Sequence, residues 1–402
     1  MIFIDQNTKT FIQQHITDDV KQLALKASSH SSVDIPMALR QIAARQTVKN
    51  KIPSWYENED IIYPPHLSME QCSSEKTAIY KSHLCKGNTL TDLTGGLGVD
   101  FVYMSSKVNK STYVEAQKEL TELAQHNFKS LNLGNCAIIN DDAVDYLNSL
   151  EEIQDIIYID PARRSKSGSK TVLIEDCTPN LIEIDDLLDS KANKIIIKLS
   201  PMLDISRAIK SLNNISEIHI ISIANECKEL LFIKENKRED KIKIYCVNIP
   251  NNGQEESFIF TPEQEKEITI KYTDSVLQYL YEPNSSILKG GAYKSIASKF
   301  GLEKLHPNSH LYTSDNYIGD FPGRKFLVKK TFSPNKKELK ENLRSLSQAN
   351  ISIRNYPFSV AELRKQTKLK EGGLDYLFAT TLSNEKKVLI LCEKADIKYS
   401  PS

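Results

Sequence analysis

The chain has 402 residues, 40% of them hydrophobic, which allows two or three domains with cores of their own and excludes a chain disordered throughout. Its 52 basic and 52 acidic residues cancel, and it contains no run of about 18 apolar residues, the length that a membrane helix needs. The start, MIFIDQNTKTF, lacks the basic and apolar regions of a secretion signal, so we expect a soluble, cytoplasmic protein.

The cysteine and histidine spacing argues against metal and disulfide chemistry. The seven cysteines, at positions 72, 85, 136, 177, 227, 246 and 392, form no CxxC pair, and there is no HExxH. Zinc sites and disulfide frameworks depend on closely spaced ligands or cysteines. We therefore expect buried, reduced thiols and no metal site.

Charge is unevenly distributed along the chain. Residues 286–370 contain 17 Lys and Arg against 6 Asp and Glu, a net charge of +11, whereas residues 141–190 contain 4 against 13, a net charge of −9. This asymmetry favours a basic module that meets a polyanion, joined to a module with an acidic working site. A solvated, lysine-rich surface is the alternative.

The predicted elements begin with helices. Residues 1–85 are polar with apolar residues at helical spacing, as in DDVKQLALKA and PMALRQIAARQTVKN. Pro64 and Pro65 break the chain, and SSEKTAIYKSHL then predicts a short amphipathic helix that Ser73 or Ser74 caps. We expect a helical N-terminal region over 1–85.

From residue 88 the pattern changes to short β-branched runs with helices between them. NTLTDLT, STYVEA, CAIIN, DIIYID and KIIIKLS each predict a buried strand, and QKELTELAQHNFKSLN predicts an intervening helix. This alternation indicates a parallel sheet covered by helices on both faces. EIHIISIAN, ELLFIK and KIKIYCVNI follow with little helix between them and predict an antiparallel finish. A Rossmann-like α/β domain is therefore expected over 86–250.

The remaining residues predict an α+β module. NIPNNGQEES has the composition of a linker, and it is followed by strand-like FLVKKTF and helix-like PNKKELKENLRSLSQAN. We divide this region into 251–325, the linker with a first segment, and 326–402, a terminal domain.

A glycine-rich turn follows the first predicted strand. Asp92 ends that strand, and the turn runs through Thr94, Gly95, Gly96 and Gly98. Neither the G-x-G-x-x-G spacing of a dinucleotide site nor the GK[ST] of a P-loop is present. An acid repels a phosphate and attracts an ammonium group, so the turn suits a ligand with a cationic amino-acid head, such as S-adenosylmethionine.

Further acids stand at the next strand ends. Glu115, followed by Ala116, ends the second strand and is placed to accept ribose hydroxyls. After the third strand, Asp142 is placed to accept from an adenine amino group, and the backbone of Ala143 to face the ring. Helix capping by Asp142 is an equal alternative.

The fourth strand ends in Asp160-Pro161-Ala162-Arg163-Arg164. Here a carboxylate, with a carbonyl from the rigid proline turn, can accept hydrogens from an amine and direct its lone pair at a methyl donor. An ordinary proline turn is the alternative. Arg163, Arg164, Lys166 and Lys170 could grip phosphates or stack on a base, and a solvated loop is nearly as consistent with them.

These residues resemble class I S-adenosylmethionine-dependent methyltransferases. The turn D-x-T-G-G-L-G-x-D is similar to that of small-subunit rRNA guanine-N2 methyltransferases, which also have Thr at the position of Thr94. Asp160-Pro161 is followed by Ala-Arg, where many amino-methyltransferases have Pro and an aromatic residue that stacks on the base; here an arginine could stack instead.

Nearly the full length resembles a bacterial methyltransferase group with a helical N-terminus, a ferredoxin-like segment and a THUMP-like C-terminal domain. The strings that carry this resemblance are QCSSEKTAIYK, EPNSSILKGGAYKSIASKFGLEKLHPNSHLYTSD, FPGRKF and NYPFSVAELRK. The resemblance implies that Asp92, Gly96 and Gly98 bind the methionine end, Glu115 the ribose and Asp142 the adenine, and that Asp160 faces the acceptor.

THUMP domains are associated with RNA, so the resemblance implies an RNA substrate, rRNA or tRNA, held by the basic 286–370 segment. We therefore expect an enzyme that methylates a base nitrogen, with guanine N2 as the first candidate. A methyltransferase acting on a small molecule or protein and a non-catalytic RNA-binding protein are the alternatives.

Two further hypotheses concern residues outside the strand ends. Gln71 and Ser73 could lie over the methionine end of the cofactor, although an ordinary capped helix fits the string better. Aromatic residues interleave the basic segment and could stack on bases, although core packing is the commoner role; they are Tyr281, Tyr293, Tyr312, Tyr317 and Phe321.

Overall fold

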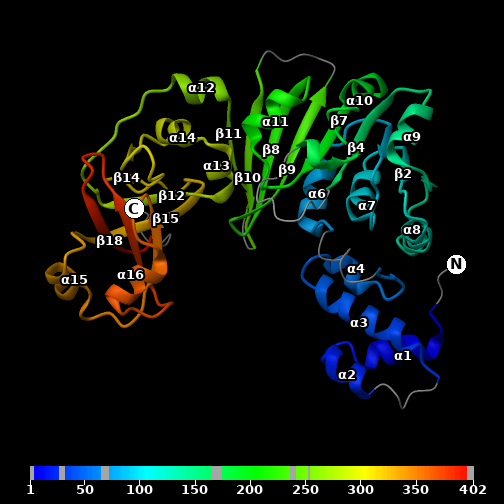
Figure 1. The fold of residues 1–402 in the computed structure, drawn as a ribbon, viewed down its shortest axis with the longest axis horizontal. Helices are drawn as coiled ribbons and strands as arrows, with labels where there is room; N and C mark the ends of the chain where they lie inside the picture. Colours follow the sequence, from blue (N-terminus) through cyan, green and yellow to red (C-terminus); the bar gives the residue numbers. More distant parts are fainter. Residues whose placement is uncertain are drawn as a thin grey trace, which may run out of the picture. The chain divides into compact units, whose positions relative to one another are not determined.

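The computed structural model describes residues 4–26, 32–64, 72–163, 174–235, 241–251 and 254–395. The chain divides into two compact units (Figure 1). The first unit comprises Met1–Ile218 and Glu229–Asp240, and the second comprises His219–Lys228 and Lys241–Ser402. Of the helices in the described ranges, none combines the length and apolarity that a membrane span requires.

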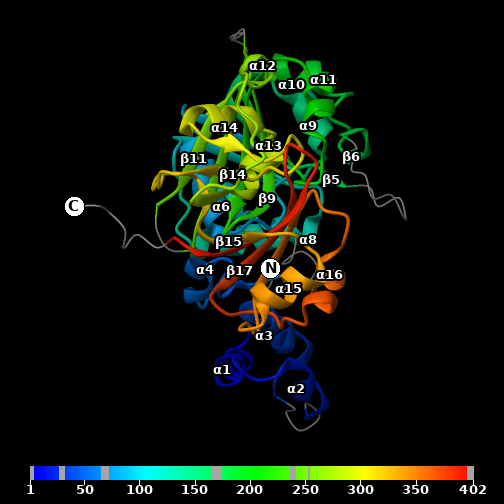
Figure 2. The ribbon, with the colours of Figure 1, turned by 90° about the vertical axis from the view of Figure 1, so that its left-hand side faces the viewer.

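The first unit begins with the predicted short helices. Asp5 and Asp34 cap two of them, because each carboxylate accepts a hydrogen bond from the backbone N–H three residues ahead. Their apolar side chains pack with Leu120 and Leu123 of α8 (Lys118–Ser130). Helices α1, α2 and α3 lie together in Figure 2. The helices are α1 (Gln6–Gln14), α2 (Val20–Lys26), α3 (Ile35–Val48), α4 (Pro53–Glu57) and α6 (Glu75–His83).

A mainly parallel sheet forms the centre of the first unit, in the order β9-β7-β4-β1-β2-β3. Its strands are β1 (Thr89–Asp92), β2 (Lys110–Val114), β3 (Cys136–Ile139), β4 (Gln154–Ile159), β7 (Ala192–Leu199) and β9 (Glu226–Glu235). Five strands are parallel, and β9 runs antiparallel to β7. The chain leaves β1 toward β2 and later returns to its other side with β4. Ligands of open α/β sheets bind at such a switch point, beyond the carboxyl ends of the strands.

Helices connect these strands, as the Rossmann-like prediction requires. They are α7 (Val99–Ser105), α8, α9 (Ala143–Ser149), α10 (Asp185–Lys191) and α11 (Ile205–Ser211). The middle residues of the central strands are buried, as in Ile156 and Ile196, both 0% exposed. The prediction of a buried third strand was wrong for β3, whose residues are partly exposed because β3 is the last strand of the sheet.

The second unit contains two groups of strands. One has the order β11-β10-β8, from β8 (Ile215–Ile223), β10 (Lys243–Ile249) and β11 (Glu256–Phe260). Strands β10 and β11 are antiparallel, so the string NIPNNGQEES connects two paired strands. The hairpin of β8 and β9 passes through both units, because residues 219–228 belong to the second.

The other group is a seven-stranded sheet in the order β13-β14-β12-β15-β18-β17-β16. Neighbouring strands in this sheet are antiparallel, except that β16 and β17 are parallel. The strands are β12 (Tyr279–Pro283), β13 (Glu303–Lys304), β14 (Tyr312–Ser314), β15 (Gly323–Phe332), β16 (Asn350–Arg354), β17 (Asp375–Thr381) and β18 (Lys387–Lys394). The helices are α12 (Pro262–Glu267), α13 (Ser285–Gly290), α14 (Tyr293–Phe300), α15 (Lys336–Leu343) and α16 (Val360–Thr367). The predicted α+β character of this region is thus present.

Candidate active site

The glycine turn lies between β1 and α7, at the carboxyl end of the sheet. Gly96 and Gly98 have φ of +56° and +82°, a left-handed conformation that favours glycine. A Cβ on Gly95 would lie 2.1 Å from the ring of Tyr113, so this position also excludes a side chain. Local sterics therefore explain all three glycines, and the turn brings the chain back over the strand ends.

Hydrogen bonds tie the turn to the neighbouring strands. The Gly96 N–H donates to Glu115 Oε2 at 2.9 Å, and the Asp160 N–H donates to Thr94 Oγ1 at 2.7 Å. The Thr94 N–H donates to Asp92 Oδ1 at 3.0 Å. The structure thus brings together the predicted residues from three strand ends and the turn.

Glu115 and Ala116 stand at the end of β2. Glu115 is buried, and its Oε1 accepts from the Gln117 N–H at 2.8 Å. Ala116 is exposed, and its carbonyl accepts from Asn140 Nδ2 at 3.0 Å, which fixes the segment after β3 against that after β2. Sequence reasoning assigned no role to Asn140.

Asp142 is the N-cap of α9. Its Oδ1 accepts from the N–H groups of Val144 and Asp145, at 2.8 and 3.4 Å. The capping alternative is therefore confirmed, and the adenine contact remains a prediction. Ala143, the first residue of the helix, is buried.

Asp160 follows β4, and 38% of its side chain is exposed. Pro161 is buried, and the chain continues into β5 (Ala162–Arg163), which pairs with β6 (Cys177–Thr178). The side chain of Arg163 and the predicted residues Arg164, Lys166 and Lys170 lie outside the described part of the chain.

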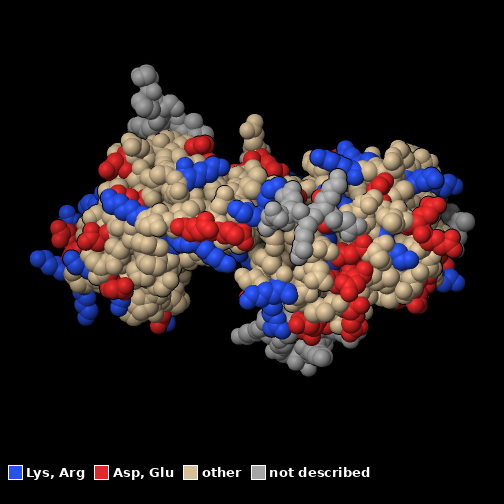
Figure 3. Space-filling model, turned by 90° about the horizontal axis from the view of Figure 1, so that it is seen from above, with Lys and Arg blue, Asp and Glu red and all other residues tan. Residues whose placement is uncertain are grey.

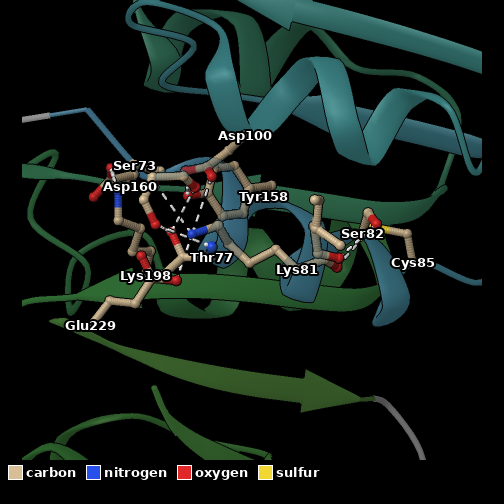
Figure 4. A network of polar contacts seen from close by, with 12 residues as sticks. Ser73, Thr77, Lys81, Ser82, Cys85, Asp100, Tyr158, Asp160, Lys198 and Glu229 are labelled. Carbon is tan, nitrogen blue, oxygen red and sulfur yellow. Dashed lines mark hydrogen bonds and ion pairs between the residues drawn. The ribbon is translucent and has the colours of Figure 1, made fainter. Parts of the chain in front are cut away.

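Behind Asp160 lies a buried polar network that the sequence did not predict (Figure 4). Lys198 of β7 approaches Asp160 with 2.5 Å between Nζ and Oδ2. The same Nζ lies 3.0 Å from Ser73 Oγ and 3.6 Å from Asp100 Oδ2. Asp160 is therefore held by an ammonium group that is itself surrounded by acceptors.

Asp100 is the centre of this network. Its Oδ2 accepts from Ser73 Oγ and from the Tyr158 hydroxyl, each at 2.7 Å. Lys81 of α6 lies 3.1 Å from Asp100 Oδ1 and 2.5 Å from Glu229 Oε1. Asp100 is the last acid of the motif DLTGGLGVD, which was the one available signal for it.

Burial and charge shift the pKa values of these groups in opposite directions. Burial raises the pKa of Asp92 well above 3.8, and the nearby carboxylates of Asp100, Asp160 and Glu115 add to the shift. Burial would also raise the pKa of Asp100, but the ammonium groups of Lys81 and Lys198 lower it to about 2. Asp92 is thus the carboxyl that favours an incoming cation, whereas Asp100 already has two.

Burial would lower the pKa of Lys198, but the carboxylates of Asp160, Asp100 and Glu229 raise it above its ordinary 10.5. Lys198 is therefore an ammonium ion at neutral pH. Its sequence signal was a lysine at the end of the apolar run KIIIKLS.

Ser73 and Ser74 have separate roles. The Ser74 side chain caps α6 by accepting from the Thr77 N–H, whereas Ser73 joins the network around Lys198 and Asp100. Gln71 lies outside the described residues.

The aromatic residues of the basic segment are mostly core residues. Tyr281 and Tyr312 are 0% exposed and Phe321 is 1% exposed, so core packing, the commoner role, is confirmed for these three and base stacking is excluded. Tyr317 is half-buried, and the half-buried ring of Tyr293 stacks on His310 with 3.7 Å between centroids. These aromatic side chains stabilise the second unit.

Many basic side chains of residues 286–370 have partners within the second unit. Arg324 and Arg354 both pair with the buried Glu282, and Lys294 donates to backbone carbonyls. A group on α15, α16 and their C-terminal ends is exposed, and we call it the α15–α16 basic set: Lys336, Lys337, Lys340, Arg344, Lys365 and Lys368. Both helices pack on the same core (Figures 1 and 2).

Several acids of residues 141–190 are exposed in the first unit. Its exposed acids include Asp145, Glu151, Glu152 and Asp186. Figure 3 shows acidic side chains gathered on one face of that unit. Among the described residues, no group of three or more His, Cys, Asp or Glu is arranged to hold a metal ion.

Two family models match the C-terminal part of the chain, and one solved structure matches nearly its full length. Residues 279–322 match the model of a ferredoxin-like domain, and residues 323–394 match a model described as THUMP domain-like. A solved structure from Porphyromonas gingivalis W83, provisionally named a methyltransferase, is 35% identical. The alignment covers 98% of this chain and 100% of that one, with a TM-score of 0.88.

Two further solved structures, also provisionally named methyltransferases, align over part of the chain. The one from Escherichia coli is 18% identical and covers 37% of this chain and 78% of its own, with a TM-score of 0.28. The one from Streptococcus mutans, in complex with SAH, is 15% identical and covers 40% and 96%, with a TM-score of 0.30. No curated protein matches.

Proposed function

Because the chain belongs to the class I methyltransferase family in which a Rossmann-like domain is joined to ferredoxin-like and THUMP-like segments, we propose that it methylates a base nitrogen of RNA, with guanine N2 as the first candidate. S-adenosylmethionine is the proposed methyl donor. The observation that carries the proposal is the position of Asp160 at the switch point of the sheet: its backbone N–H donates to Thr94 of the glycine turn, and its side chain is 38% exposed.

The residues around the turn fit this cofactor. Asp92 is 1% exposed, and within the described part of the chain it meets no ammonium or guanidinium group. Its raised pKa reflects burial among other carboxylates, so a bound ammonium group would be favourable there. Within 4 Å, a Cβ on Gly96 would meet only the Thr94 carbonyl oxygen, at 3.8 Å, so a ligand can approach the backbone there.

The other predicted contacts complete the cofactor site. Gly95, Gly96 and Gly98, with Thr94, form the turn around the methionine end. Glu115 and Ala116 would meet the ribose, and Asp142 and Ala143 the adenine. When bound, S-adenosylmethionine supplies a methyl group on a sulfonium sulfur. The neutral thioether that remains after transfer is a good leaving group.

Catalysis by this chain would consist mainly of orientation. Asp160 would accept a hydrogen bond from the amino group of the base and so direct the nitrogen lone pair at the methyl group. Pro161 would fix the turn that presents Asp160, and Arg163 would stack on the base.

The second unit would hold the RNA. We propose the domain boundaries 1–85, 86–250, 251–325 and 326–402, with the last domain as the main RNA contact. The α15–α16 basic set supports this assignment, because exposed Lys and Arg bind phosphates by releasing counterions.

Methyl transfer from tritium-labelled S-adenosylmethionine tests the reaction. The acceptors, in separate assays, are the RNA, the protein and the small-molecule fractions of cells that lack this protein. The RNA is then digested to nucleosides and analysed by mass spectrometry. We expect one labelled nucleoside, lost in Asp160→Ala and retained in Glu152→Ala, which changes an exposed acid just before the same strand. Label in metabolites or proteins, with none in RNA, would contradict the RNA proposal and favour the other acceptors; cofactor binding without any transfer would favour a non-catalytic protein.

RNA affinity as a function of salt concentration tests the role of the basic set. Replacing Lys336, Lys337 and Lys340 by Gln should reduce the slope of log affinity against log salt by up to about 3, roughly one for each phosphate that the variant no longer binds. Gln at Lys110, Lys118 and Lys129, three exposed lysines of the first unit, is the matched control. Equal slopes in the two triple variants would contradict this RNA interface.

A further inference from the structure

Strand register places Lys198 beside Asp160. Strands β4 and β7 are parallel, with Ile157 opposite Ile195 and Ile159 opposite Ile197. Continued by one residue, this register sets Asp160 opposite Lys198. Their contact, 2.5 Å between Nζ and Oδ2, thus follows from the strand pairing.

Exposure increases along the network toward Asp160. The side chain of Lys81 is 0% exposed, that of Glu229 5%, Asp100 9%, Lys198 12% and Asp160 38%. In Figure 4 these side chains converge on the two lysine ammonium groups. Asp160 is therefore the member of this network that a large acceptor can reach.

Lys198 has further contacts besides the one with Asp160. Ser73 Oγ accepts from its Nζ at 3.0 Å, and Asp100 Oδ2 lies at 3.6 Å. Asp100 is in turn fixed by Lys81 and by the Tyr158 hydroxyl. A lysine bound on three sides has few other rotamers, so the carboxylate that it contacts is also fixed in orientation.

We propose that Lys198 is the positioning residue of the methyl-transfer site: it binds Asp160 Oδ2 and so directs Oδ1 at the amino group of the acceptor. This inference rests on the proposed function. In the reaction, the nitrogen lone pair forms the N–C bond, the S–C electron pair stays on sulfur, and the extra proton on nitrogen leaves to water. Lys198, already an ammonium ion, takes no part in that proton transfer.

Steady-state kinetics of Lys198 variants test the proposal. Lys198→Met should lower kcat about 100-fold, because the Asp160 carboxylate is free to rotate, with little change in the Kd of S-adenosylmethionine. Lys198→Arg keeps the charge and should recover part of the loss. Ser73→Ala removes one anchor of Lys198 and should lower kcat by about 3- to 10-fold.

Lys234→Met is the matched control. Lys234 also lies on the β7–β9 pair and is fully buried, but it contacts Asp185 and Asp189 of α10. This variant should lose stability and keep kcat per folded molecule. If Lys198→Met keeps the wild-type kcat, or if the Lys198 and Lys234 variants lose kcat equally, the positioning role is wrong. A higher affinity of Lys198→Met for the acceptor would also overturn it. In that case the Lys198 ammonium group would only occupy the position that the amino group of the acceptor takes.

A measurement that needs no methyl transfer separates this inference from the proposed function. The carboxyl carbon signal of Asp160, assigned with Asp160→Asn, is recorded by NMR at neutral pH in the wild type and in Lys198→Arg and Lys198→Gln. The Gln variant should show a displaced signal with faster local motion, because the carboxylate loses the ammonium group that holds it at 2.5 Å, and the Arg variant should resemble the wild type. An unchanged signal in Lys198→Gln would overturn the inference, whereas failure of the wild type to methylate RNA would overturn only the proposed acceptor.

Discussion

The first unit contains two buried lysine clusters on the same pair of strands, and they differ in the exposure of their last carboxylate. Lys234 pairs with Asp185 and Asp189, whose side chains are 5% and 14% exposed. Both acids have further partners: Asp185 Oδ2 accepts from the Asn213 N–H at 2.9 Å, and Asp189 Oδ2 accepts from Asn214 Nδ2 at 2.8 Å. This cluster is closed, because the oxygens of its carboxylates are occupied from within the protein.

The cluster of Lys198 has the same chemistry and an open end. Lys81, Asp100 and Glu229 are as deeply buried as the Lys234 cluster, but the chain of contacts finishes at Asp160, which is 38% exposed. A closed cluster can contribute only to stability, whereas an open one presents a carboxylate of fixed orientation to a ligand. The comparison therefore indicates that a buried charge cluster is structural when its last carboxylate is buried and functional when that carboxylate is exposed.

The largest effect on stability should come from Lys234→Met. Removing the lysine leaves Asp185 and Asp189 buried without a counter-ion, which typically costs about 3–5 kcal/mol. Denaturant unfolding should show this loss, and methyl transfer per folded molecule should be unchanged. Loss of activity in the folded variant would show that the closed cluster also acts in catalysis, and the comparison would fail.

Asp160→Asn should give the converse result. The amide has one acceptor oxygen, and Lys198 will bind it, so the amide nitrogen faces the acceptor and cannot accept from its amino group. We expect kcat to fall about 100-fold. The free energy of unfolding should change less than in Lys234→Met, because Lys198 retains Asp100 and Ser73. A rate close to that of the wild type would contradict the role of Asp160 as hydrogen-bond acceptor.

Asp92 is a buried carboxyl with no lysine partner among the described residues. Replacing Asp92 should therefore stabilise the fold, whereas removing Lys234 should destabilise it. Its pKa is raised in the fold above the 3.8 of the ordinary side chain, so between these values the folded state binds more protons. Its contribution to the free energy of unfolding therefore falls as pH rises through that window. Asp92→Asn should be more stable than the wild type at neutral pH by about 1–3 kcal/mol, and it should bind S-adenosylmethionine more weakly.

Asp100→Asn is the control for Asp92, because the pKa of Asp100 is lowered from 3.8 to about 2 by its lysines. Its stabilising contribution is complete above pH 3.8 and is lost as pH falls toward 2, so this variant should be less stable at neutral pH. Unfolding curves from acid to neutral pH measure both variants. The same sign of effect for Asp92 and Asp100 would contradict the assignment.

The smallest effect is expected at Asp142, an exposed acid outside both clusters. Asp142→Ala should cost about 1 kcal/mol through loss of the α9 cap, whereas Asp142→Asn should keep the cap within a few tenths. In the Asn variant the single oxygen serves the cap and cannot also accept from adenine, so the Kd of S-adenosylmethionine should rise about tenfold. Wild-type affinity in Asp142→Asn, measured by calorimetry, would leave Asp142 with the capping role alone.

Much of the first unit could be predicted from sequence, because its signals are local. Short β-branched runs indicated the strands, and the positive φ angles of Gly96 and Gly98 follow from local backbone sterics, whereas Gly95 is required by the ring of Tyr113 on the next strand. The exposure of β3 was predicted wrongly because burial depends on the place of a strand in its sheet. The roles of Tyr281 and Tyr312 were left open for the same reason, since a tyrosine in a basic segment looks the same in sequence whether it is buried or exposed.

The sequence by itself determined the order of the elements, the glycine turn and the acids at the ends of successive parallel strands, since each depends on neighbours along the chain. Only the tertiary structure decided which charges meet. Lys81 and Glu229 are 148 residues apart, and Lys198 and Asp160 are 38 apart, yet each pair is in contact at 2.5 Å. Strand order, register and the position of α6 set these contacts, and the burial of the two lysines, which strengthens their attraction to the carboxylates, exists only once the core has formed.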